Sequence, residues 1–250
     1  MISKSLPRLH RFAAARFSPE GEYGLHLTIG VLLLLAAMAG FARLAGAVVA
    51  GAPITELDLA IANWLHLHAT DGGLLRDGLL VLTHIHSTPG ILIIAAAVGV
   101  WLYRRGHRYW IVALVSSVPG GMLLNVALKH TFERARPHFE QPIVTLSTYS
   151  FPSGHTMAAT VLYGVLACYC ARHARSWWGR VLPFVLAALM IGTIAFSRMY
   201  LGAHYLTDIL AALVEGCGWL AICVSGAATL NRRQAARQRR AAGAGPAREI

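Results

Sequence analysis

Long apolar runs separated by short polar segments dominate the pattern along this chain of 250 residues. Six of the runs approach or reach the ~20 residues that an α-helix needs to cross a bilayer. They cover about Leu25–Val49, Pro89–Tyr103, Tyr109–Leu128, Gly154–Cys170, Val181–Phe196 and His204–Ser225. The pattern therefore predicts an all-α, polytopic membrane protein with six transmembrane helices.

The segment between the first two runs, residues 51–88, has a different pattern. Its apolar positions, which include Trp64, recur at helical spacing between polar residues such as Asp58 and Arg76. Amphipathic stretches of this kind lie in the plane of the membrane surface. We expect a helix or a pair of helices at the interface.

The spans form one domain, residues 25–228, preceded by a basic segment, 1–24, and followed by a basic tail, 229–250, expected to be disordered. The first run could instead be a cleaved signal peptide, since small residues lie near its end at Ala45-Gly46-Ala47. Both the run and its leader are long for a signal peptide, which favours an uncleaved anchor.

Composition excludes an ordinary soluble domain, because 56% of the residues are hydrophobic and the mean hydropathy is +0.54. The net charge of +11 could suggest nucleic acid. Much of it lies between apolar runs and in the tail, as in the inward-facing loops of membrane proteins. No nucleic-acid-binding module accompanies the charge, so we expect no such partner. The four cysteines lie inside apolar runs, without metal-ligand or disulfide spacing.

The charge distribution also predicts the orientation. The leader, the turns at 104–108 and 172–180, and the tail are basic and would share one side, which we assign to the cytoplasm together with both termini. The loops at 129–152 and 197–204 would face outward. Besides Arg76 and Arg43, the outward cations are Lys129, Arg134, Arg136 and Arg198. The positive-inside rule disfavours cations in outward loops, and binding of an anion is the simplest reason for finding them there.

Three of these cations have side chains that are suited to binding a phosphate group. The Arg136 and Arg198 guanidinium groups match phosphate oxygens with a planar fork, and Lys129 offers a point charge. Each residue alone could equally be a cation that reaches for lipid headgroups. That alternative explains poorly why the same side presents two histidines.

The tetrapeptide Pro152-Ser153-Gly154-His155 opens the fourth run. Ser153 suits a helix N-cap, and Gly154 allows close approach of the backbone to a ligand. The N–H groups and dipole of a helix start form an anion site, with His155 within one turn of it. The alternative is a plain capped helix start with an interfacial histidine.

His204 and Asp208 are four residues apart at the start of the sixth run, so they share a helix face. A carboxylate bonded to one ring nitrogen fixes the histidine tautomer and leaves the other nitrogen free as a nucleophile. A purely structural His–Asp pair is the alternative.

In this order and spacing, the clusters resemble the signature of the type-2 phosphatidic acid phosphatase superfamily. The signature residues lie within 129–208 and read Lys129…Arg136-Pro137, Pro152-Ser153-Gly154-His155 and Ser197-Arg198…His204…Asp208. That superfamily includes bacterial phosphatidylglycerophosphate and undecaprenyl-diphosphate phosphatases, glucose-6-phosphatase and vanadium haloperoxidases. The resemblance implies the superfamily's helical fold.

The resemblance also implies residue roles. His204 would attack phosphorus and form a phosphohistidine, Asp208 would orient it, and His155 would protonate the leaving oxygen. The phosphate oxygens would be held by Lys129, Arg136, Arg198, Ser153 and Gly154. The phosphatases of the superfamily require no metal, so we expect neither a metal nor another cofactor.

The resulting hypothesis is a lipid-phosphate phosphatase in the bacterial inner membrane, with its site at the outer face. The expected substrates are undecaprenyl diphosphate, phosphatidylglycerophosphate or phosphatidate. A lipid phosphotransferase and a lipid A phosphatase are alternative enzymes. A non-enzymatic lipid carrier or scaffold is an alternative of another class and would not need His155 and His204. The sequence leaves the oligomeric state open.

Overall fold

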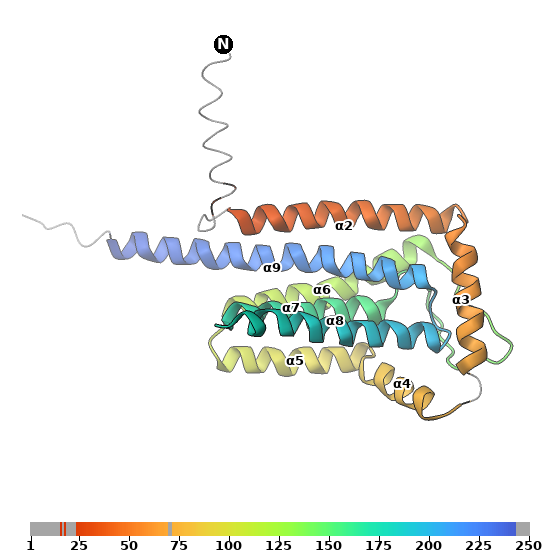
Figure 1. The fold of residues 1–250 in the computed structure, drawn as a ribbon. Helices are drawn as coiled ribbons and strands as arrows, with labels where there is room; N and C mark the ends of the chain where they lie inside the picture. Colours follow the sequence, from red (N-terminus) through yellow and green to blue (C-terminus); the bar gives the residue numbers. More distant parts are fainter. Residues whose placement is uncertain (1–15, 17, 19–23, 70–71, 244–250) are drawn as a thin grey trace, which may run out of the picture.

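A computed structural model of the chain describes residues 16, 18, 24–69 and 72–243. Most of the N-terminal segment 1–24 and the last residues of the tail lie outside this part. The helices follow one another as α2 (Leu25–Val49), α3 (Ile54–Ala69), α4 (Leu74–Ile85), α5 (Thr88–Arg104), α6 (Arg108–Phe132), α7 (Gly154–His173), α8 (Trp177–Tyr200) and α9 (Leu206–Gly243) (Figure 1). The described residues form no strand, which confirms the all-α prediction.

The predicted membrane spans correspond to helices. α2, α6, α7, α8 and α9 are each long and apolar enough to cross a membrane. α4 and α5 meet the same test only as a pair, with a bend of 59° between them. Counting this bent pair as one gives six spans, as the hydrophobic pattern predicts.

The last helix is longer than expected. α9 continues to Gly243, whereas the sequence pattern ends the span at about Ser225 and predicts a disordered tail from residue 229. Alanine, glutamine and arginine, which dominate the extension, are strong helix formers, so the helix persists beyond Leu230, where the side chains are mostly exposed. α2 runs alongside α9 (Figure 1), and the His26 ring lies 3.0 Å from the Thr229 hydroxyl.

α7 lies in the middle of the bundle and packs against α5, α6, α8 and α9. Its buried side chains, including Met157 and Val161, belong to the main hydrophobic core. Gly121 lets α6 approach α7 closely, because a Cβ atom there would lie only 2.3 Å from Met157 Cε. This packing fixes where the N-terminus of α7 lies.

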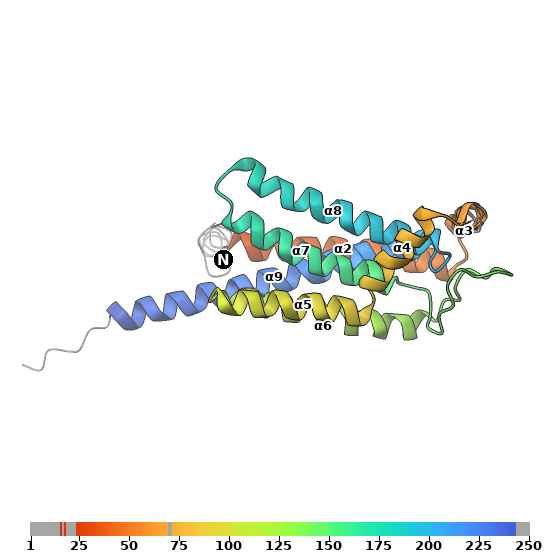
Figure 2. The ribbon, with the colours of Figure 1, turned by 90° about the horizontal axis from the view of Figure 1, so that it is seen from below.

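The predicted interfacial segment forms α3 and α4. α3 crosses one end of the bundle, and α4 lies beside it at the same end (Figures 1 and 2). Contacts of α3 with α8 and α9, and of α4 with α8, hold them there. The loop between α6 and α7 and the turn between α8 and α9 reach this end, so the motif residues are brought together.

Candidate active site

A cavity of about 680 Å³ lies at this end of the bundle. Its polar end contains six of the eight predicted site residues: Lys129, Arg136, Gly154, His155, Arg198 and His204. Asp208 and Ser153 are fully buried and do not line it. The structure therefore brings residues of α6, α7, α8 and two connecting segments into one anion-attracting space.

His204 lies in the turn between α8 and α9, where its backbone N–H donates to the Arg198 carbonyl at 3.2 Å. Its Nδ1 is 3.3 Å from Asp208 Oδ2, and its Nε2 is 3.3 Å from Arg136 Nη1. A guanidinium group can only donate, so Nε2 must carry the lone pair and Nδ1 the proton. The nitrogen with the lone pair is therefore the one that faces the cationic Arg136.

The protonation state of His204 suits a nucleophile. Burial lowers the pKa of His204 to about 3, although the neighbouring Asp208 carboxylate acts in the opposite direction. The ring is therefore neutral at pH 7, and the Nε2 lone pair remains available to attack.

Both carboxylate oxygens of Asp208 accept hydrogen bonds. Oδ1 accepts from Arg134 Nη1 at 2.6 Å, while Oδ2 accepts from the Ser150 hydroxyl and from the Tyr205 N–H at 2.9 Å. The carboxylate is oriented before it meets His204. It lies away from the cavity and would act on a substrate only through the His204 ring.

The pairing of Arg134 corrects the expectation that the outward cations all bind an anionic substrate. Its guanidinium bridges Asp208 and Asp58, which lies 2.8 Å away on α3. Asp58 also accepts the Thr207 N–H at 2.9 Å, and Arg134 stacks over the Tyr205 ring at 4.3 Å. Two buried carboxylates need a compensating charge, and Arg134 supplies it.

The loop between α6 and α7 wraps around Lys129 and Arg136. Lys129 Nζ donates to the Tyr149 carbonyl at 2.7 Å. Arg136 donates to the Thr148 and Ala203 carbonyls, each at 2.7 Å, and further N–H groups reach the Thr148 hydroxyl and the Tyr149 carbonyl. An entering phosphate would therefore compete for the Arg136 N–H that faces His204.

Arg198 keeps donor capacity for a ligand. It is only 2% exposed, and its Nη1 donates to the Thr83 hydroxyl. Its Nε is buried without a hydrogen-bond partner in the described protein. A buried donor without a partner is costly. Its Nη2 also has no hydrogen-bond partner among the described residues and is not fully buried, so Nη2 is the donor that a phosphate oxygen in the cavity could reach.

Ser153 departs from its predicted role. It occupies the N-cap of α7, but its N–H donates to the Asp208 carbonyl at 3.1 Å and its hydroxyl pairs with Thr156. Because the starts of α7 and α9 pack together, both Ser153 groups are used inside the protein. Gly154, the next residue, does line the cavity.

The buried Arg134 pairing predicts a large effect on stability. Arg134→Ala should leave Asp58 and Asp208 without a counter-charge and lower the stability by about 3–5 kcal/mol. Thermal unfolding in detergent measures this loss. The double variant Arg134→Ala/Asp58→Ala should recover part of it, and equal melting temperatures for wild type and Arg134→Ala would show that the pairing is not stabilising.

Comparison with known proteins adds independent evidence. The model of the PAP2 superfamily, the type-2 phosphatidic acid phosphatases, matches residues 110–232. Phosphatidylglycerophosphatase B of Bacillus subtilis is 32% identical over 57% of this chain and 70% of its own length. Undecaprenyl-diphosphatase BcrC of the same organism is 24% identical over 55% of this chain and 68% of its own. The crystal structure of a transmembrane PAP2-type phosphatidylglycerolphosphate phosphatase from Bacillus subtilis superposes with a TM-score of 0.64, at 27% identity, over 77% of this chain and 94% of its own.

Proposed function

The chain belongs to the PAP2 superfamily, and from this membership we propose that it hydrolyses the phosphate monoester or diphosphate of a membrane lipid. The substrate class comprises undecaprenyl diphosphate, phosphatidylglycerophosphate and phosphatidate. The named relatives act on the first two of these, according to their names.

The main support for the proposal is the lining of the cavity, which has a polar end and an apolar wall. Next to the cations and histidines, apolar side chains of α5 and α6 line the cavity, including Ile91, Leu92, Met122, Leu123 and Val126. From Lys129 to Pro119 the wall follows α6 for about 15 Å, at ~1.5 Å per residue. A phosphorylated lipid matches both parts, with its phosphate at the cations and a hydrocarbon chain along the wall.

The geometry supports a two-step reaction. His204 Nε2 attacks phosphorus, and the bond to the leaving oxygen breaks as His155 supplies a proton to it. Arg198, Arg136 and Lys129 stabilise the charge on the remaining oxygens. Water then attacks phosphorus, the bond from His204 Nε2 to phosphorus breaks, His155 takes a proton from the water, and inorganic phosphate leaves.

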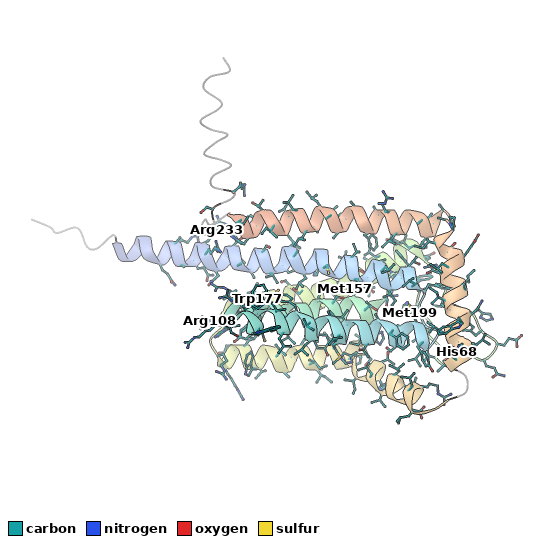
Figure 3. All side chains as sticks on the ribbon, viewed as in Figure 1. His68, Arg108, Met157, Trp177, Met199 and Arg233 are labelled. Atoms are coloured by element: carbon teal, nitrogen blue, oxygen red, sulfur yellow. The ribbon has the colours of Figure 1, made fainter. Side chains whose placement is uncertain are left out.

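The proposed orientation places the site at the outer face of the bacterial inner membrane. Arg108 and Trp177 lie at one end of the bundle, and Met199 and His68 lie at the other (Figure 3). Met199 follows Arg198, so the site is at the end opposite the basic turns. The positive-inside rule assigns the basic end to the cytoplasm.

Phosphate release by the detergent-purified protein, with EDTA present, tests the proposal. The panel contains undecaprenyl diphosphate, phosphatidylglycerophosphate, phosphatidate and lipid A. We expect release from at least one of the first three to survive EDTA, because the phosphate ligands in the cavity are protein cations. Release only from lipid A would favour that alternative. Release from none of the four by folded protein would contradict the proposal and favour a phosphotransferase or a non-enzymatic carrier.

A further inference from the structure

Thr83, in the last turn of α4, contacts two site residues that come from other helices. Its hydroxyl accepts a hydrogen bond from Arg198 Nη1 on α8. Its backbone lies next to the ring of His155 on α7. The side chain is 7% exposed. α4 lies outside the motif-bearing region, yet it reaches both a phosphate ligand and the proton donor.

The end of a helix makes the backbone bond possible. The last carbonyl groups of an α-helix have no partner within the helix. The Ser87 N–H, four residues after Thr83, donates to the His84 carbonyl. The Thr83 carbonyl is therefore available to the His155 ring.

Two further features fix this end of α4. His86 Nδ1 donates to the Leu82 carbonyl at 2.8 Å, and Nε2 accepts from the Tyr163 hydroxyl of α7 at 2.6 Å. Gly90 allows the sharp bend into α5, because a Cβ atom there would lie 1.9 Å from the Ile85 carbonyl oxygen. The position of Thr83 is thus set by α5 and α7 together.

We infer that Thr83 is a positioning residue for both Arg198 and His155, an inference that rests on the proposed phosphatase function. By holding Nη1 of Arg198, it fixes the guanidinium so that Nη2, which has no partner among the described residues, can donate to a phosphate oxygen. In this inference the His155 ring donates to the Thr83 carbonyl, and because a carbonyl only accepts, the donating nitrogen carries a proton. The opposite ring nitrogen then faces the leaving oxygen, and it donates a proton when the ring is protonated on both nitrogens. The Thr83 carbonyl would thus fix the orientation of the His155 ring, as the Asp208 carboxylate fixes the orientation of the His204 ring.

Thr83→Val tests the side-chain half of this inference. Valine keeps the shape and the backbone carbonyl but removes the hydroxyl, so Arg198 loses its anchor while His155 keeps its own. We expect kcat/KM to fall by about 10-fold to 100-fold, the effect of a lost hydrogen bond to a charged group. Thr83→Ser should restore most of the activity. Thr193→Val removes a hydroxyl from the exposed face of α8 and should leave activity unchanged.

Two further measurements separate positioning from packing. The Thr83→Val effect should shrink to less than about threefold in an Arg198→Lys background, because interacting residues are not additive. Titration with inorganic phosphate should show weaker binding by Thr83→Val, and it reports on the site even if the wild type proves inactive on every lipid. Wild-type phosphate affinity in Thr83→Val, or an equal loss of activity in both backgrounds, would overturn the inference.

Discussion

Replacing His204 with alanine is expected to reduce phosphate release by about 10⁴-fold or more, the loss typical of a removed nucleophile. The variant removes the only atom that we propose to bond covalently to phosphorus. It should also leave the cations of the cavity in place, so the substrate would still bind. A large fall in kcat with little change in KM is therefore the expected pattern.

A histidine outside the proposed site provides a control for the His204→Ala substitution. His84 is exposed on α4, and His84→Ala should retain wild-type rates. Acid-labile labelling of the protein by a ³²P-labelled substrate should be visible in the wild type and His84→Ala, and absent from His204→Ala. Labelling that persists without His204 would contradict its role as the nucleophile.

The sequence predicted the helices and most of the site because these features depend on local patterns. A long apolar run tends to form a membrane helix, so the pattern predicted the spans that correspond to α2, α6, α7, α8 and α9. The remaining span passes only as the bent pair of α4 and α5, and the sequence had assigned α4 to the interface. His204 and Asp208 were predicted to share a helix face, but His204 lies in the turn before α9. The spacing of four residues still brings Nδ1 to 3.3 Å from Asp208 Oδ2. Lys129, Arg136 and Arg198 were noticeable as cations on the side where the charge rule disfavours them.

The contacts that orient these residues depend on tertiary packing. Asp58 meets Arg134 only because α3 crosses the end of the bundle, and the chain positions of the two residues do not indicate this. Thr83 had no sequence signal, since its role arises from the bend between α4 and α5. Ser153 was predicted to face phosphate, but the packing of α7 against α9 directs its groups inward.

His155→Ala should affect substrates unequally, because a proton donor matters most for a poor leaving group. Phosphatidylglycerophosphate must expel an alkoxide oxygen, and its kcat/KM should fall by about 10²–10⁴-fold. Undecaprenyl diphosphate expels a lipid phosphate, which is stable as an anion, and should lose about 10-fold or less. Initial rates at low substrate concentration give both values.

The choice of kcat/KM makes this comparison specific to the first step. kcat/KM covers events up to the first irreversible step, which is phosphoryl transfer to His204, so a second role of His155 with water does not obscure it. His204→Ala provides the contrast, since loss of the nucleophile should reduce both substrates to a similar degree. Equal losses for both leaving groups in His155→Ala would show that the ring binds the phosphate instead of donating a proton. The carbonyl of Thr83 would then fix a phosphate ligand, and general acid catalysis would have to come from another group in the cavity.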